Sequence, residues 1–466
     1  MRLASAIFLL AVASVAASRA GATDLVEAWR AAQEHDPQYL AARAAHEAGG
    51  ARRQQASALW RPSVAISGTA GRMSSNTEVS GAQFATPAFG RSDGVAFDTS
   101  VNNGASGHWA VSARQPLFNL ERLAQGRQLD LSAGAADLEW QGAQQSLIVR
   151  TAERYFALAL AQETLNLLRE QQAAAERARD EAQERFRVGD APITDTEEAN
   201  ARALALSAQV LAAEAELQLQ QAALADLTGL APAQLHPQVP DSALDPSLGE
   251  TRPLERWIAE VTQNNPRLRS QAAAVDIARQ EANRYRAYAS PSLDLVAEMG
   301  RDHLGGTGDF GPASNVTSNR MIGLQLTVPV FTGGYRSARL HEANSLADKE
   351  QELEAGVRQQ VAQQTRASWL GLTVGARRVQ ALEQALQASH LRLEATRLGH
   401  EVGDRTTLDL LNAQSDASAA QRDLLQARVA LILDRLRLAE QAGALDESTL
   451  LAVNAGLATR GAKAND

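Results

Sequence analysis

The sequence contains no cysteine and few aromatic side chains. Cys is absent from its 466 residues, and Phe, Trp and Tyr together make up only 4% of them. Without a thiol the chain cannot form a disulfide, a thiolate metal site or a cysteine nucleophile. It also cannot carry a lipid on an N-terminal cysteine, so any attachment to a membrane needs another device.

Lysine is almost absent as well, since Lys349 and Lys463 are the only two. Arginine therefore supplies nearly all of the positive charge, and the formal net charge is −9. Nucleic-acid binding depends on neutralising phosphates with basic side chains. A chain this acidic is not expected to have a nucleic-acid partner.

The motifs of several common enzyme classes are missing too. No Gly-x-x-x-x-Gly-Lys-Ser/Thr, His-Glu-x-x-His or Gly-x-Ser-x-Gly segment occurs. The eight histidines are scattered, and none is paired at the spacing of metal ligands. We therefore expect a protein that is not an enzyme and has no cofactor and no metal site.

The N-terminus has the layout of a secretory signal. Arg2 precedes the apolar stretch Ala4–Ala17, and the small residues Ala20–Ala22 follow it. This order predicts a signal peptide at 1–22, with a buried helix as the alternative. No later run reaches the roughly 18 apolar residues of a transmembrane helix. The mature chain is expected to be soluble in the periplasm, extracellular, or an outer-membrane protein built from strands.

The rest of the chain resembles two copies of one unit, which predicts a repeat architecture. Each copy is expected to run helix, strand, loop, strand, long helix, turn, long helix. The matched landmarks are Pro37 with Pro266, Pro62 with Pro291, 115–118 with 328–331, Val188-Gly189 with Val402-Gly403, and Asp195 with Asp409.

The repeat sets the predicted boundaries. The segments are a first repeat at 23–228, a linker or equatorial segment at 229–253, a second repeat at 254–445, and a C-terminal equatorial segment and flexible tail at 446–466. Strands are expected near 62–73, 107–118, 291–302 and 319–331, and long helices at 119–187, 193–228, 333–398 and 405–442.

The strands are predicted from alternation. Ile322, Leu324 and Leu326 alternate with more polar neighbours, which is the period of a strand with one apolar face. Loops rich in Gly, Ser, Asn and Thr are expected between the strands, at 74–107 and 303–319. These pairs fit membrane-barrel hairpins with long outer loops. A soluble, half-buried sheet fits the alternation equally well.

The helical segments are long and rich in small residues. Residues 119–187 contain no proline and would extend roughly 100 Å as one helix. Val361, Leu372, Val379 and Leu386 belong to a series at heptad spacing, which predicts coiled-coil packing. Many seam positions are Ser, Thr, Gly or Ala, which bury little apolar area. We therefore expect many helices side by side.

Two hairpins give each chain only four strands. About eight strands are needed to close a barrel, and a strand in lipid cannot leave an open edge. If these strands lie in a membrane, several chains must share one barrel, with their helices continuing as a tube. Such an assembly is a conduit.

Three segments resemble the TolC family of outer-membrane efflux and secretion channels. Residues 185–195 (RFRVGDAPITD) resemble its first periplasmic turn, and 399–413 (GHEVGDRTTLDLLNA) its second. Residues 328–334 (VPVFTGG) resemble its strand-to-helix junction. The resemblance extends over nearly the whole mature chain, from about Asp24 to Asn454.

The resemblance implies an α+β membrane protein of the outer membrane of a Gram-negative bacterium. Each chain of a homotrimer would give four strands to a shared 12-stranded β-barrel, surrounded by outer-membrane lipid, and long coiled-coil helices to a periplasmic α-barrel. The implied partners are a periplasmic adaptor protein and an inner-membrane pump of the ABC or RND type. The implied function is an exit duct for type I secretion of proteins, for drug efflux, or for both. The alternative is a soluble periplasmic coiled-coil adaptor or scaffold, which the twofold repeat does not favour.

The resemblance assigns a constriction to Asp409. It matches an aspartate that forms the narrowest ring of the periplasmic end, where three carboxylates would attract cations and repel anions. Asn412 lies one helical turn further, where the family has a second aspartate, so a single charged ring and a weaker cation block are expected. Thr406 and Asp409 also form the pattern of a capping box, which is the favoured interpretation without the resemblance. Both roles can coexist.

Four further residues match a lock between neighbouring helix pairs. Arg405 would donate to Thr194 and Asp195, because its planar fork makes several hydrogen bonds at once. His400 replaces a tyrosine that bonds the residue matched by Asp195. Protonated His400 would hold Asp195 more tightly, so the closed state should strengthen as pH falls. A His400→Phe variant that opens with the same pH dependence would contradict this hypothesis. Ordinary solvated turn residues are the alternative.

The hairpin tips are the predicted adaptor contacts. Val188-Gly189 and Val402-Gly403 occupy corresponding positions in the two repeats. Glycine there permits both the turn and the close approach of a partner helix. The alternative is that the two glycines serve the turn alone.

Overall fold

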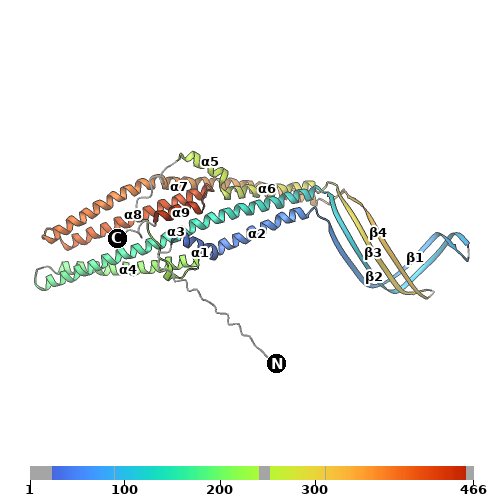
Figure 1. The fold of residues 1–466 in the computed structure, drawn as a ribbon, viewed down its shortest axis with the longest axis horizontal. Helices are drawn as coiled ribbons and strands as arrows, with labels where there is room; N and C mark the ends of the chain where they lie inside the picture. The colour runs from blue at the N-terminus through green and yellow to red at the C-terminus, as the bar shows by residue number, and fades with distance from the viewer. Residues whose placement is uncertain (1–23, 89, 191, 241–251, 310, 458–466) are drawn as a thin grey trace, which may run out of the picture. The chain divides into compact units, whose positions relative to one another are not determined.

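The computed structural model divides the chain into two compact units (Figure 1). We call 1–46, 138–270 and 355–466 the helical unit, and 47–137 and 271–354 the strand unit. Each unit combines segments of both sequence repeats. The described residues are 24–88, 90–190, 192–240, 252–309 and 311–457. The predicted signal peptide, part of the predicted linker and the end of the predicted tail lie outside them.

The strand unit contains one antiparallel sheet with the strand order β1-β2-β3-β4. Its strands are β1 Ser63–Thr86, β2 Gly90–Phe118, β3 Ser292–Gly308 and β4 Gly311–Thr327. β1 pairs with β2, β2 with β3, and β3 with β4. In the described part of the chain, the outer edges of β1 and β4 have no strand partner.

The strands are longer than the alternation predicted. The stretches 74–107 and 303–319, expected as loops, are mostly strand, and residues 75–86 pair with 90–101 beyond the edge of β3. Antiparallel pairing uses backbone groups, so it continues through Ser, Thr, Asn and Gly without an apolar face. Gly81 and Gly94 have positive φ angles and lie where the register shifts, as glycines in β-bulges do.

The cross-strand register gives the sheet two different faces. Val64, Val111, Met299 and Ile322 lie on one, which we call the apolar face. Val64, Met299 and Ile322 are exposed in the single chain, and Val111 is half-buried. The opposite, polar face carries alternating residues such as Asp294.

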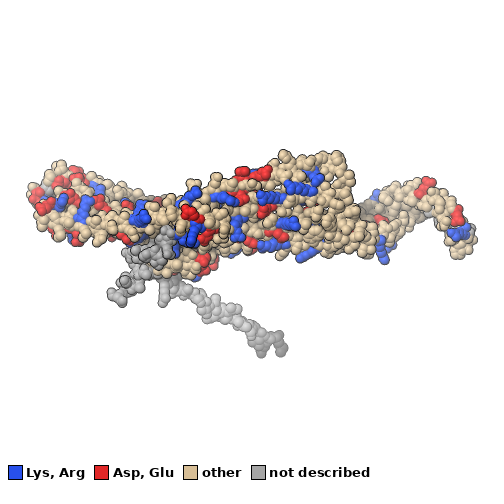
Figure 2. All heavy atoms as spheres, turned by 90° about the horizontal axis from the view of Figure 1, so that it is seen from above, with Lys and Arg blue, Asp and Glu red and all other residues tan. Residues whose placement is uncertain are grey.

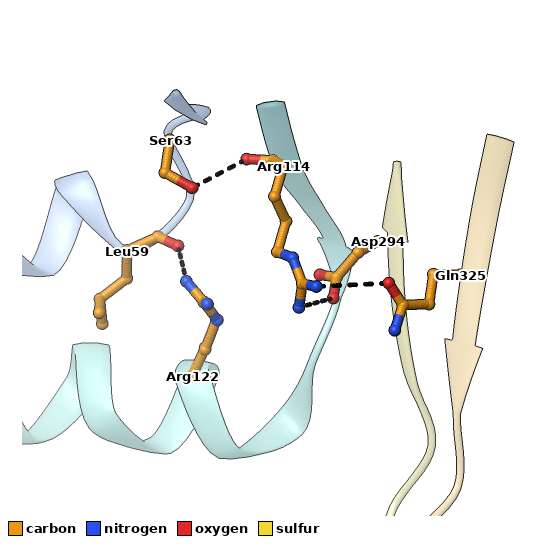
Figure 3. Close-up of polar contacts among 6 residues, drawn as sticks. All are labelled: Leu59, Ser63, Arg114, Arg122, Asp294 and Gln325. Atoms are coloured by element: carbon orange, nitrogen blue, oxygen red, sulfur yellow. Dashed lines mark hydrogen bonds and ion pairs between the residues drawn. The ribbon is translucent and has the colours of Figure 1, made fainter. Parts of the chain in front are cut away.

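An arginine ties three strands together on the polar face (Figure 3). Arg114 on β2 donates to Asp294 Oδ2 on β3 at 3.4 Å and to Gln325 Oε1 on β4 at 3.3 Å. Nearby, Arg122 donates to the carbonyl oxygen of Leu59 at 2.8 Å. These contacts fix the end of the sheet from which the chain continues into helices.

The four long helices end within three residues of the predicted segments. They are α3 Leu120–Arg187, α4 Ile193–Thr228, α7 Tyr335–Glu401 and α8 Thr407–Gln441. The shorter helices are α1 Leu25–His35, α2 Pro37–Ala58, α5 Leu254–Asn264, α6 Pro266–Ala287 and α9 Glu447–Leu457, with a 3₁₀ turn at Pro232–Gln234. α9 lies in the segment 446–466, which was predicted as a C-terminal equatorial segment and flexible tail. Among the described residues, no helix is both long and apolar enough to cross a membrane.

Apolar side chains of α1, α3, α8 and α9 form the main core of the helical unit. Tyr155 and Phe156 are its largest fully buried members and meet edge to face at 5.4 Å between ring centroids. Along α7 and α8 the heptad series is buried as predicted, including Val361, Leu372 and Val379. A methyl group on Gly371 of α7 would clash with the Asp434 carboxylate of α8, so the two helices approach closely there.

The repeated Asp-Pro and Asn-Pro pairs cap corresponding helices. Asp36 Oδ2 accepts from the backbone N–H of Tyr39 at 3.0 Å, and Asn265 Oδ1 accepts from Leu268 at 3.0 Å. Asp36 is only 3% exposed and forms an ion pair with Arg150 of α3 at 2.6 Å. Burial alone would raise the pKa of Asp36, but the hydrogen bonds from Arg150 and Tyr39 bring it below its ordinary value.

Replacing Arg150 with methionine should strongly destabilise the helical unit. The Arg150→Met variant leaves the Asp36 carboxylate buried without its charged partner, which costs about 3–5 kcal/mol. The matched control is Arg169→Met, because Arg169 pairs with Glu214 on the surface and should contribute less than about 1 kcal/mol. Urea unfolding in detergent measures both. Equal losses in the two variants would contradict a structural role for the buried pair.

A partly buried carboxyl group makes the stability of the helical unit depend on pH. Burial raises the pKa of Glu440 to about 7, and the nearby Glu153 carboxylate adds to this while Arg437 opposes it. Arg437 itself bonds Glu153 at 2.6 Å and Asp434 at 3.3 Å. The Arg437 guanidinium thus pairs with two carboxylates and also interacts with the Glu440 carboxyl group.

Glu440 should lower the free energy of unfolding as pH rises from 4.5 to 7. Over this range the unfolded chain loses the proton that the folded chain retains. Glu440→Gln should therefore remove this slope and stabilise each protomer by about 1–2 kcal/mol at pH 8, with little effect at pH 4.5. Unfolding curves across this pH range test it, with the exposed Glu352→Gln as control. A Glu440→Gln variant with the wild-type slope would refute the assignment.

Candidate functional site

The two helical hairpins of the helical unit end in the same turn. At the first tip, the N–H of Asp190 donates to the carbonyl oxygen of Arg185 at 2.8 Å, and that of Gly189 donates to Phe186 at 3.0 Å. At the second tip, Asp404 and Gly403 make the corresponding bonds to Gly399 and His400, at 2.8 and 3.1 Å. This pair of bonds defines a Schellman motif.

The motif explains the repeated Val-Gly pairs. Gly189 and Gly403 have φ angles of 83° and 84°, which glycine adopts without strain. A side chain at either position would meet nothing within 4 Å, so in one chain the glycines serve the turn, not a close approach. The preceding Val188 and Val402 are 72% and 75% exposed. Each tip therefore presents an uncovered apolar side chain.

Asp409 forms the capping box that the sequence indicated. The N–H of Asp409 donates to Thr406 Oγ1 at 3.1 Å, and Asp409 Oδ2 accepts from the Thr406 N–H at 3.0 Å. The Thr406 backbone bond, followed by the hydroxyl bond, lowers the pKa of Asp409 below its ordinary value. The carboxylate is therefore ionised and held in one orientation at the start of α8. Asn412, one turn later, is exposed.

Asp195 occupies the corresponding position of α4 but has a different local role. The N-cap of α4 is Pro192, which has no side-chain acceptor, so no capping box forms. The Asp195 carboxylate instead accepts from the Thr194 hydroxyl at 3.4 Å and remains exposed. It is therefore available to partners outside its own turn.

Arg405 and His400 stay within the second hairpin. The Arg405 side chain packs over Gly399, and His400 Nε2 lies 3.3 Å from Thr407 Oγ1. Among the residues that the structure describes, Arg405 makes no hydrogen bond to Thr194 or Asp195. The predicted lock is thus not formed within one protomer and stays a prediction about the assembly.

Both hairpins nevertheless line one pocket of about 140 Å³. Asp195 of the first hairpin and Thr406 and Thr407 of the second line it. Sequence reasoning missed the three charged residues beside them, which are Arg185, Glu198 and Arg202. Arg185 stands at the start of the segment that resembles the first periplasmic turn, and the signal for Glu198 and Arg202 was their helical spacing from Asp195.

A larger pocket of about 590 Å³ lies between α3 and the second hairpin. His400 lines it together with residues that the sequence did not single out: Arg177, Glu181, His390, Glu394 and Arg397. Figure 2 shows acidic and basic side chains interspersed around this hairpin-tip end of the helical unit. The tips are therefore highly charged but carry no single sign. No group of His, Asp and Glu suited to a metal ion occurs in the described part of the chain.

Thr406→Ala should loosen the first turn of α8. The substitution removes the acceptor for the Asp409 N–H, and a lost N-cap typically costs about 1 kcal/mol. Hydrogen–deuterium exchange of peptides covering 406–411 should become about five-fold faster. Thr194→Ala is the matched control because Thr194 is not a cap, so exchange at the start of α4 should not change. Unchanged exchange in Thr406→Ala would mean that the capping box does not hold this turn.

Comparison with known proteins identifies the fold. The family model described as outer membrane efflux protein matches residues 28–230 and 257–444. Among solved structures, the Campylobacter jejuni CmeC outer membrane channel aligns with a TM-score of 0.70 and 16% identity, over 93% of this chain and 89% of that one. The Vibrio cholerae outer membrane protein VceC aligns with a TM-score of 0.68 and 19% identity, over 90% and 96%.

Curated relatives agree with this result. The alkaline protease secretion protein AprF of Pseudomonas aeruginosa is 30% identical over 92% of this chain and 86% of its own length. The outer membrane protein TolC of Vibrio cholerae is 28% identical over 97% and 98%. The chain therefore belongs to the outer membrane efflux protein family and is an outer-membrane channel with the TolC-like fold.

Proposed function

We propose that three copies of this chain form the exit duct of a type I protein secretion system. The observation that carries the proposal is the open four-stranded sheet with an exposed apolar face, joined to two long helical hairpins. Three such sheets supply twelve strands, enough to close a barrel with lipid outside and a polar lumen.

The cargo of the duct is protein. Two relatives covered over most of their length, AprF and the Dickeya chrysanthemi PrtF, are named for the secretion of proteases. The matched structures of efflux channels support the fold alone, so drug efflux is the weaker candidate. A periplasmic adaptor and an inner-membrane pump supply the energy, since the chain has no nucleotide-binding motif of its own.

The hairpin tips are the adaptor-contacting surface. Val188 and Val402 offer exposed apolar side chains on rigid Schellman turns, and the surrounding charges can fix the orientation of a partner helix. Gly189 and Gly403 hold these turns. Adaptor contact would cover the two valines, which are 72% and 75% exposed among the described residues.

The second hairpin of each chain lines the constriction. Asp409 is ionised and oriented by its capping box, so three copies around one axis place three carboxylates in a narrow passage. Asn412 adds no charge. In the closed state, Arg405 of one protomer bonds Thr194 and Asp195 of its neighbour, and His400 approaches the same aspartate.

Removing the Asp409 carboxylate should change ion selectivity. In planar bilayers the wild-type trimer should show a small cation-selective conductance that divalent cations block, and Asp409→Ala should weaken that block at least ten-fold. Asn412→Asp should strengthen it by adding a second ring. Single-channel recording measures all three proteins.

The control is Asp190→Ala, which removes one carboxylate from a hairpin tip. It should leave the divalent block within two-fold of wild type. If Asp409→Ala and Asp190→Ala behave alike, Asp409 is a helix cap and not a constriction. If no conductance appears from a folded trimer, the duct itself is wrong.

A further inference from the structure

Toward the strand turns, the apolar face of the sheet carries arginine side chains as well as apolar ones. The same face carries Arg320 on β4 in the row of Ile66, Arg301 on β3 in the next row toward the turns, and Arg72 on β1 two rows further. The register fixes this placement, because directly paired residues share a face. Arg301 pairs with Trp109, and Arg320 pairs with Met299.

The charges of the sheet are separated by face. Along the rows from Val64 to Arg72 and their partners on the other strands, the apolar face carries no Asp or Glu. The carboxylates of the same strand segments lie on the polar face, where Asp302 Oδ1 lies 2.7 Å from His108 Nδ1. The arginines of the apolar face therefore have no acidic side chain in these rows of the same face with which to form an ion pair.

The three arginines are exposed and have no internal partner. Within the described residues, Arg72, Arg301 and Arg320 form no hydrogen bond or ion pair. Arg301 and Arg320 are diagonal neighbours on adjacent strands, since the partner of Arg301 on β4 is Ser318. Side chains in this relation are close enough to bind one group together.

The length of the apolar band places two of these arginines at its edge. On this face Ile322, Leu324 and Leu326 follow Arg320 to the end of β4 at Thr327, and the exposed Val328 and Val330 continue the apolar series just beyond the strand. Together these positions cover roughly the ten residues that a tilted strand needs to cross a bilayer. Arginine facing lipid costs least near the interface. Trp109, beside Arg301, is a side chain typical of that level. The helices leave from the other end of the sheet. With the helices on the periplasmic side, this edge faces the outer leaflet.

We propose that Arg301 and Arg320, together with Trp109, bind a phosphate-bearing lipid of the outer leaflet. The planar guanidinium groups can each take two phosphate oxygens, and Trp109 packs against the apolar part of the lipid. Arg72 lies two residues beyond Ala70 on the same face, toward the turns, and strengthens the positive field. The trimer carries three such sites, and lipid bound there anchors the barrel at a fixed depth. This goes beyond the export function and rests on the proposed trimer with its helices on the periplasmic side of the outer membrane.

The test is lipid binding to the purified trimer. Native mass spectrometry in detergent would be titrated with lipid A carrying two phosphates, and separately with the same lipid after removal of its phosphates. Wild type should bind the phosphorylated lipid at least ten-fold more tightly. Arg301→Gln with Arg320→Gln should abolish that preference, and inorganic phosphate at equal concentration should not compete.

Two further variants keep the result decisive. Arg91→Gln with Arg256→Gln removes the same charge from exposed positions outside the site and should bind as wild type does. Arg301→Lys with Arg320→Lys keeps the charge and should retain part of the preference, even if the glutamine variant does not assemble. Equal binding of both lipids by wild type, or an unchanged preference in the glutamine variant, would overturn the proposal. Channel conductance, measured on the same samples, reports separately on the proposed duct.

Discussion

The open edges of the four-stranded sheet are the constraint on which the rest of the structure depends. β1 and β4 each use one edge for pairing and leave the other free in the described chain. In lipid, unpaired backbone groups are too costly to persist, so the sheet can be stable there only when copies of the chain complete one another. The apolar face has a different requirement: no described residue covers it, so it needs lipid.

In the helical unit, close helix packing at small residues and helix caps stabilise the arrangement of the long helices. Its long helices bury apolar cores, and close approach at positions such as Gly371 and a buried pair such as Asp36–Arg150 help to hold them in register. Each repeat starts a helix with the same kind of cap, and each hairpin ends in the same Schellman turn. Repetition of the chain thus gives repetition of local structure.

Where the two repeats differ, the local roles of equivalent residues also differ. Asp409 caps α8 because Thr406 precedes it by three residues, whereas Asp195 follows Pro192 and remains free to face the second hairpin. One repeat therefore supplies an oriented carboxylate and the other an exposed one. The two hairpins therefore present different carboxylates despite their similar sequences.

The sequence by itself determined the elements that depend on local chemistry. The long helices, the heptad seam of α7, the caps and the glycine turns follow from neighbouring side chains, and the predicted ends of α3 and α4 differ from the observed ones by no more than one residue. Tertiary structure decided what depends on partners far apart in the chain. The outer parts of β1 and β2 were missed because backbone pairing needs no apolar pattern. The pocket joining Asp195 to Thr406, and the face shared by Trp109, Arg301 and Arg320, required the packing of hairpins and the register of strands, which no local pattern encodes.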